Sequence, residues 1–225
     1  MRLIALFVIL FSLTFQIHGQ SASDIDLPAD DGRVLRGTYH VPFEGDAPAV
    51  LLLHQMYTTS ASWDRVIDPL LENGYRVLAV DLRGYGRTRG AIDWQKAQDD
   101  TQTWMNWLAA QPGVGAIQIM GSSMGANLGL VGCAQAARCT GAVALSPGLH
   151  YFGVYTQDAL TSGKPALILY ADRDRIPRRD VPQMIELAGE SLTVQTYSGR
   201  AHGIDLLRAY PESLSVIIDW LNAHR

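Results

Sequence analysis

The chain has 225 residues, of which 48% are apolar, and this suits one globular domain with a sizeable core. Its formal net charge is −4, and no Lys/Arg-rich tract offers a footprint for a phosphate backbone. Composition and charge therefore argue against a nucleic-acid-binding protein and against a wholly disordered one. The sequence has no basic amphipathic segment, so we do not expect binding to a membrane surface.

The N-terminal segment has the pattern of a secretory leader. Residues 1–17 start with a positive charge and continue as an almost wholly apolar run. That run is shorter than the roughly 20 residues of a membrane-spanning helix, and nothing polar interrupts it at a helical or strand period. We expect a signal peptide over residues 1–22, ending at Gly19 or Ala22. The mature protein would then be periplasmic or secreted, with no stable membrane insertion; a buried core element and an uncleaved anchor are the alternatives.

After the leader, short apolar runs alternate with longer amphipathic segments. The apolar runs predict strands at 33–41, 49–53, 76–80, 116–120, 141–145, 166–170 and 192–197. The amphipathic segments predict helices at 63–72, 94–110, 124–136, 181–188 and 211–224. This alternation is typical of an α/β domain, with a mostly parallel central sheet flanked by helices on both faces. We expect one domain over residues 23–225, with its chemistry beyond the C-terminal ends of the strands.

A nucleophile motif follows one of these strands. Gly121-Ser122-Ser123-Met124-Gly125 is G-x-S-x-G, between the strand at 116–120 and the helix from Met124. A serine held on such a sharp turn exposes its hydroxyl, and the small neighbours let strand and helix approach closely. Ser123, at the centre of the motif, is the candidate nucleophile. The backbone N–H of Met124, at a helix N-terminus, is a candidate donor to an oxyanion.

A serine needs a base, and the base needs an acid. His202 lies in a Gly-flanked loop after the last predicted strand, where the base is expected. Two carboxylates, Asp172 and Asp174, follow the strand at 166–170. We predict Asp174 as the acid, because it stands far enough beyond the strand to turn back toward the histidine. For Asp172 we expect a surface ion pair with a neighbouring arginine.

Two further segments carry a family resemblance. Leu53-His54-Gln55-Met56 resembles the H-G-x loop of α/β hydrolases, and Asp81-Leu82-Arg83-Gly84-Tyr85-Gly86 is similar to their D-x-R-G-x-G segment. Together with the serine motif and the acid and histidine loops, they resemble the family in order across almost all of the mature chain. The resemblance implies that Met56 supplies a second oxyanion N–H and that His54 shapes the loop. Gln55 stands where the family usually has Gly, and its side chain would line the pocket, donate a hydrogen bond or point to solvent.

The pocket and substrate are less defined by the sequence. The segment 146–165 is too short for a large helical cap, so we expect an open site. His54, Gln55, Tyr151 and Phe152 are candidates for its wall; for the aromatic residues, packing in the core is the alternative. No P-loop, H-E-x-x-H or Cys/His cluster is present, and the glycines of residues 84–90 miss the dinucleotide spacing, so we expect no cofactor and no metal.

These residues predict a serine hydrolase that acts on a small molecule with a carboxylic ester, thioester or lactone bond. A catalytically silent binding protein of the same fold and a peptidase-like hydrolase are the alternatives, because the fold does not choose the substrate. The two cysteines, Cys133 and Cys139, predict a disulfide if the protein is exported. Two buried thiols are the other interpretation.

Overall fold

The structure is a computed structural model, and it describes residues 20–225. The predicted signal peptide lies almost entirely outside the described residues, so the leader and the export that it implies stay predictions. The first strand, β1, begins at Ser21. Cleavage after Gly19 would leave β1 complete, whereas cleavage after Ala22 would remove its first two residues.

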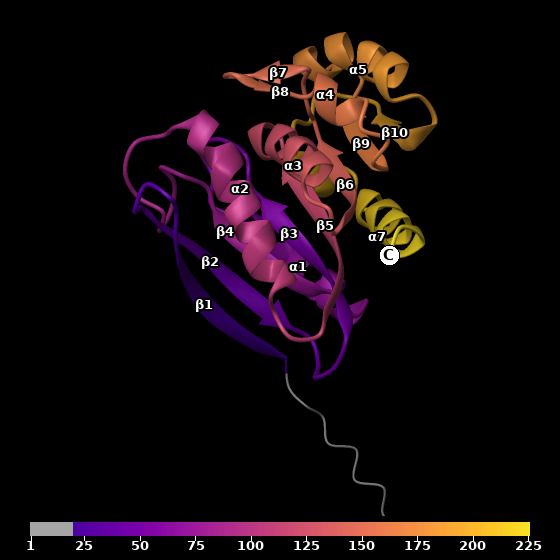
Figure 1. The fold of residues 1–225 in the computed structure, drawn as a ribbon. Coiled ribbons are helices and arrows are strands. Elements are labelled where there is room, and N and C mark those ends of the chain that lie inside the picture. The colour runs from indigo at the N-terminus through magenta and orange to yellow at the C-terminus, as the bar shows by residue number, and fades with distance from the viewer. Residues whose placement is uncertain (1–19) are drawn as a thin grey trace, which may run out of the picture.

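One eight-stranded sheet forms the centre of the molecule, in the order β1-β2-β4-β3-β5-β6-β9-β10 (Figure 1). The β1–β2 and β2–β4 pairs are antiparallel and all the others are parallel, so the predicted mostly parallel sheet is confirmed. The strands are β1 (Ser21–Pro28), β2 (Val34–Val41), β3 (Ala47–Leu53), β4 (Arg76–Asp81), β5 (Val114–Ser122), β6 (Cys139–Leu145), β9 (Ala166–Ala171) and β10 (Leu192–Tyr197). A separate hairpin pairs β7 (His150–Tyr151) with β8 (Val154–Tyr155).

Helices cover both faces of the sheet, as the alternation of the sequence predicted. The α-helices are α1 (Asp64–Glu72), α2 (Trp94–Ala109), α3 (Met124–Gln135), α4 (Gln157–Leu160), α5 (Arg175–Ala188), α6 (Asp205–Ala209) and α7 (Ser213–Ala223), with 3-10 turns η1 (Ser60–Trp63) and η2 (Gly189–Ser191). Helices α2 to α5 share one apolar core, and α1, α6 and α7 share the other. In β3, Leu51 and Leu53 enter the first core and Val50 and Leu52 the second. Within residues 20–225, no helix has the length and apolarity needed to cross a membrane.

The sequence analysis missed the strand β1, the hairpin β7–β8 and the short helices α4 and α6, and it misplaced the start of α5. The edge strand β1 is mostly exposed, so its polar residues hid a strand in which only Ile25 and Leu27 are half-buried. The hairpin β7–β8 has two residues in each strand, too few for a periodic pattern. Helix α5 begins at Arg175, six residues before the predicted start at 181, because Pro177 occupies its first turn, where a missing N–H is tolerated.

The strand order fixes where the chemistry can lie. From β3 the chain moves to β4 on one side, and then returns to β5 on the other side of β3. In sheets of this kind, ligands bind beyond the C-terminal strand ends at such a reversal, which here are the ends of β3 and β5. Leu53 and Gly121, near those ends, are register partners, so the loops that follow them leave the sheet side by side. These loops are the H-G-x-like loop and the serine motif.

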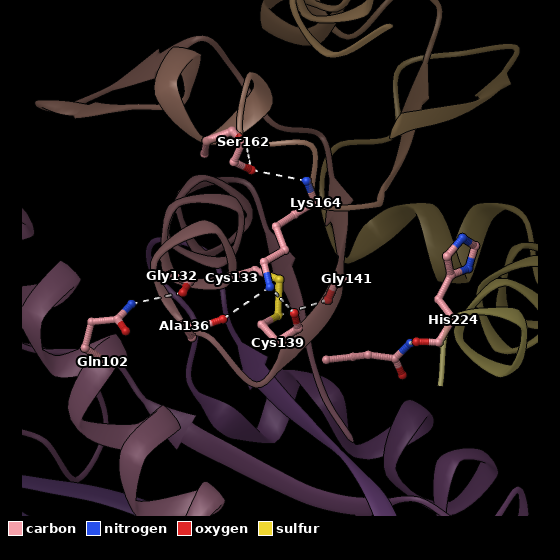
Figure 2. The surroundings of a disulfide bond; sticks show 11 residues. Gln102, Gly132, Cys133, Ala136, Cys139, Gly141, Ser162, Lys164 and His224 are labelled. Carbon is pink, nitrogen blue, oxygen red and sulfur yellow. Dashed lines mark hydrogen bonds between the residues drawn. A yellow bond between two sulfur atoms is a disulfide. The ribbon is translucent and has the colours of Figure 1, made fainter. Parts of the chain in front are cut away.

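A disulfide joins Cys133 in α3 to Cys139 at the start of β6, with 5.2 Å between the Cα atoms. Helix α3 ends at Gln135, early enough for the chain to turn back within six residues. Figure 2 shows the Lys164 ammonium against the same turn, where it donates to the carbonyl of Cys139 at 2.6 Å. Both cysteines are buried. The bridge therefore fixes the end of α3 that is remote from Ser123.

We predict that replacing both cysteines by alanine lowers the free energy of unfolding by about 2 kcal/mol, the loop-closure entropy of so short a bridge. Ten residues of helix separate Cys133 from Ser123, about 15 Å at 1.5 Å per residue, so the geometry around Ser123 should not change. Denaturant unfolding of variant and wild type measures the difference, with reductant as a control that should affect only the wild type. Equal stability of the two proteins would contradict the prediction.

Candidate active site

Ser123 stands on a strained turn between β5 and α3. Its φ is 52° and its ψ is −111°, a conformation that non-glycine residues rarely adopt. The flanking glycines make the turn sterically feasible. A Cβ on Gly121 would collide with the Gly125 carbonyl, and one on Gly125 would collide with the carbonyls of Leu53 and His54. Helix α3 can therefore begin directly against the end of β3 only because position 125 has no side chain.

The hydroxyl of Ser123 is hydrogen-bonded to His202. The Ser123 Oγ lies 2.8 Å from His202 Nε2, and the Asp174 Oδ2 lies 2.6 Å from His202 Nδ1. In this arrangement the Nδ1–H of His202 donates a hydrogen bond to the carboxylate, and Nε2 accepts a hydrogen bond from the serine hydroxyl. Ser123 and Asp174 are buried, whereas the His202 side chain is 39% exposed. The three residues come from the loops after β5, β9 and β10.

Asp172, the other acidic candidate, makes a different contact. Its Oδ1 accepts the backbone N–H of Gly199 at 2.8 Å and approaches Arg173 only to 3.9 Å. The main contact of Asp172 therefore holds the chain that leads from β10 to His202, which is more than the surface ion pair that we expected.

The loop after β3 is built on a buried histidine. His54 Nδ1–H donates to the carbonyl of Gln55 at 2.7 Å, and Nε2 accepts the backbone N–H of Leu82 at 2.9 Å. Burial lowers the pKa of His54, which keeps the ring neutral and lets Nε2 accept. His54 has no exposed surface, so it lies beneath the loop and not at a pocket wall. Within residues 20–225, no acceptor takes the backbone N–H of Met56 or of Met124.

Gln55 connects three segments of the site. Its Oε1 accepts the hydroxyl of Ser122 at 2.8 Å and the backbone N–H of Ile204 at 3.1 Å. The side chain thus accepts two hydrogen bonds through its amide oxygen, a role that the sequence analysis did not predict. A Cβ on Gly203 would collide with Oε1 of Gln55 and Oγ of Ser122, so the glycine after His202 makes room for this junction.

Ser146 is a site residue that the sequence analysis did not identify. It follows β6 with φ at 53°, is fully buried, and accepts the Gly203 N–H on its Oγ at 2.9 Å. Together with the Gln55 contact to Ile204, this bond holds the two residues after His202. The only sequence signal was a Ser-Pro step at the end of a predicted strand, which is common in turns.

The two aromatic candidates lie on the hairpin β7–β8. Tyr151 is buried, and its phenol donates to the Ser146 carbonyl at 3.3 Å. Burial, and then the negative charge of Asp174, hold the pKa of Tyr151 well above its usual value, so the phenol stays protonated. Phe152 is 60% exposed. Tyr151 is therefore buried near Ser123 and Asp174, whereas Phe152 is largely exposed to solvent.

The segment after β4 is fixed by two buried carboxylates. Asp81 accepts the backbone N–H groups of Ser60 at 2.8 Å and Arg87 at 2.9 Å. Burial acts to raise the pKa of Asp81, but these hydrogen bonds outweigh it and the pKa lies below its usual value. The buried Arg83 guanidinium bonds Asp100 on α2 at 2.5 and 2.7 Å. These contacts tie Tyr85, between them in the sequence, to the rest of the domain.

Comparisons with known proteins agree with this fold. The model of the alpha/beta hydrolase fold family matches residues 48–165. The chain is 43% identical over 54 residues to an epoxide hydrolase of Caballeronia sordidicola, covering 24% of this chain and 16% of that one. It is 29% identical over 120 residues to a 2-hydroxy-6-oxononadienedioate/2-hydroxy-6-oxononatrienedioate hydrolase of Klebsiella pneumoniae, covering 51% and 41%. The chain thus spans less than half the length of these curated relatives.

Solved structures share the fold over nearly the whole described chain. An esterase of Pyrococcus furiosus superimposes with a TM-score of 0.81 at 20% identity, covering 91% of each chain. Est1E of Butyrivibrio proteoclasticus superimposes with a TM-score of 0.73 at 16% identity, covering 89% of this chain and 99% of that one. With the family match, the fold and the order of the motifs, the chain belongs to the α/β-hydrolase fold family.

We predict that Gln55→Ala lowers the free energy of unfolding by about 1–3 kcal/mol, because the Ser122 hydroxyl and the Ile204 N–H both lose their acceptor. Thermal and denaturant unfolding measure the change. Gln98→Ala, which removes a partly exposed glutamine whose side chain donates to Gln95, is the matched control and should change stability by less than about 0.5 kcal/mol. Equal effects of the two substitutions would show that the Gln55 junction does not stabilise the fold.

Proposed function

We propose that the protein is a serine hydrolase that cleaves a carboxylic ester or a similar bond through an acyl-enzyme on Ser123. The hydrogen-bonded series Ser123–His202–Asp174 carries this proposal, with Oγ–Nε2 and Nδ1–Oδ2 distances of 2.8 and 2.6 Å. Side chains from three separate loops make these two bonds in the order that the chemistry requires. Similarity to proteins named as an esterase and as hydrolases supports the reaction class.

In this mechanism His202 acts twice. Its Nε2 takes the proton of Ser123 as the Oγ attacks the substrate carbonyl, and then gives that proton to the leaving alcohol oxygen. Asp174 holds the ring in the tautomer with the proton on Nδ1 and stabilises the imidazolium that forms. A water then repeats the sequence on the acyl-enzyme: His202 accepts its proton, the acid is released and Ser123 regains its hydrogen.

The negative oxygen of each tetrahedral intermediate needs donors, and we propose the backbone N–H groups of Met56 and Met124. Met124 is the first residue of α3, where the helix dipole favours a negative charge. The loop that carries Met56 lies against the same helix start, because Gly125 approaches the carbonyls of Leu53 and His54. The protein supplies all of these groups itself, so the proposed reaction calls for no cofactor.

We predict that a fluorophosphonate probe labels the folded protein at Ser123, because the histidine-activated Oγ attacks phosphorus as it attacks a carbonyl. Mass spectrometry of the digested adduct locates the label. Ser123→Ala should remove labelling and turnover while it leaves the fold intact, whereas Ser122→Ala should retain labelling. Folded wild-type protein that does not react would contradict the hydrolase and favour a silent binding protein.

We predict that Asp174→Asn lowers kcat by up to about 10⁴-fold, because the amide favours the wrong histidine tautomer. Asp172→Asn is the matched control. Its amide oxygen still accepts the Gly199 N–H, so the loss should stay below about tenfold. Steady-state kinetics on one small ester, with the fold checked by circular dichroism, gives both values. Equal losses, or the reverse order, would assign the acid to Asp172.

A further inference from the structure

Four non-glycine residues of the described chain have a positive φ, and all four belong to the region around Ser123. They are Tyr57, Ser123, Ser146 and Phe152, with φ of 63°, 52°, 53° and 44°. The two serines are part of the site already described. The other two are bulky aromatic residues, for which this backbone conformation is strained. Strain of this kind collects at functional sites, so each of the two needs a reason.

Packing does not supply that reason. Tyr57 is 87% exposed and Phe152 is 60% exposed, so neither side chain gains much burial from its position. Both follow directly on residues of the proposed site. Tyr57 comes after Met56 on the oxyanion loop, and Phe152 comes after Tyr151, the phenol that is buried near Ser123 and Asp174. The strained backbone therefore presents two aromatic rings to solvent, one next to Met56 in the sequence and the other next to Tyr151.

Two more rings join the hairpin to the floor of the site. The Trp94 ring lies 6.4 Å from Phe152 and 6.0 Å from Tyr85, with interplanar angles of 33° and 29°. Tyr85 in turn meets the buried His54 ring edge-on at 5.4 Å. We call Tyr85, Trp94 and Phe152 the aromatic row. The row therefore runs from the buried His54, beneath the loop after β3, to Phe152 at the tip of the hairpin.

Polar contacts hold the row in place. Gln95, beside Trp94 at the start of α2, donates to the Gly153 carbonyl at 3.0 Å. Asn127, one turn after Ser123 in α3, donates to the Val154 carbonyl at 3.1 Å and accepts the Gly148 N–H at 3.0 Å. The hairpin is therefore anchored to the nucleophile helix on one side and to α2 on the other.

The topology decides which part of a substrate would meet the row. His202 reaches Ser123 from the loop after β10, at one edge of the sheet, and Tyr85 follows β4, on the opposite side of β5 (Figure 1). A leaving alcohol must lie beside His202, because His202 protonates it. The acyl substituent of the same carbonyl then extends the other way, toward β4, Tyr85 and Trp94.

We propose that the aromatic row, with Tyr57 at its flank, is the acyl subsite and that it selects acyl groups that carry a flat aromatic ring. This inference rests on the serine hydrolase activity proposed above. Aromatic rings prefer offset or edge contacts at centroid distances of about 4.5–7 Å, the spacing that the row already shows internally. An acetyl group has no ring and would gain no such contact with the row.

Two esters with the same 4-nitrophenol leaving group test the proposal: the acetate and the 3-phenylpropanoate. The wild type should prefer the phenylpropanoate in kcat/KM. Trp94→Leu and Phe152→Ala should each lower that kcat/KM at least tenfold, mainly through KM, and change the acetate value less than twofold. Trp94→Phe keeps a flat ring and should restore most of the preference. The matched control is Phe43→Ala. Phe43 is an exposed ring against Gly74 at the other end of the sheet, so its removal should leave kcat/KM unchanged for both esters.

The rate of fluorophosphonate labelling at Ser123 separates failure of the subsite from failure of the activity. Normal labelling leaves the proposed hydrolase activity standing. The acyl subsite is then refuted if the wild type has the same kcat/KM for both esters, or if the variants lower kcat/KM equally for both. The acyl subsite would also be refuted if the sedimentation coefficient of the wild type rose with protein concentration and the Trp94 and Phe152 variants abolished this rise. The row would then be a contact between two copies of the chain. Absence of labelling refutes the proposed activity itself.

Discussion

The arrangement of the site depends on how closely helix α3 approaches the end of strand β3. The contact is made by backbone alone: Gly125 lies against the carbonyls of Leu53 and His54, and Gly121 lies against Gly125. A single methyl group at either position would separate the two segments. Ser123 would then lose the sharp turn that exposes its hydroxyl, and the loop after β3 that carries Met56 would move away from the start of α3. The two glycines thus set the distance between the nucleophile and the donors proposed to serve it.

Gln55 gives this site a support that its position in the sequence does not suggest. A glycine there would leave the Ser122 hydroxyl and the Ile204 N–H without an acceptor, and both are held by a single oxygen. One side chain therefore couples the loop after β3, the turn that carries Ser123 and the segment after His202. Its partner is again a glycine, Gly203, which has room for the junction only because it lacks a Cβ. The extra side chain at position 55 is therefore held in place by hydrogen bonds to two other segments.

The sequence predicted the parts of the molecule that depend on local pattern. Buried parallel strands appear in the sequence as continuous apolar runs. A G-x-S-x-G motif between a strand and a helix predicts the sharp turn that carries the serine. Asp174 could be preferred over Asp172 from the spacing alone. The roles of Gln55 and Ser146 could not be predicted, because they rest on contacts with residues 67, 149 and 57 positions away. The strand β1 was not predicted for another reason. An exposed edge strand needs few apolar residues, so the alternation of apolar and polar residues in its sequence is weak.

The short disulfide has a consequence for how the chain acquires its fold. The whole sequence contains two cysteines, so only one intramolecular pairing exists. They are six positions apart, and a segment of that length closes on itself within tens of nanoseconds in an unfolded chain. Formation of the bridge therefore does not require the sheet to have assembled first. A chain built this way has no mispaired isomer to escape, and its oxidation needs an electron acceptor but no isomerase.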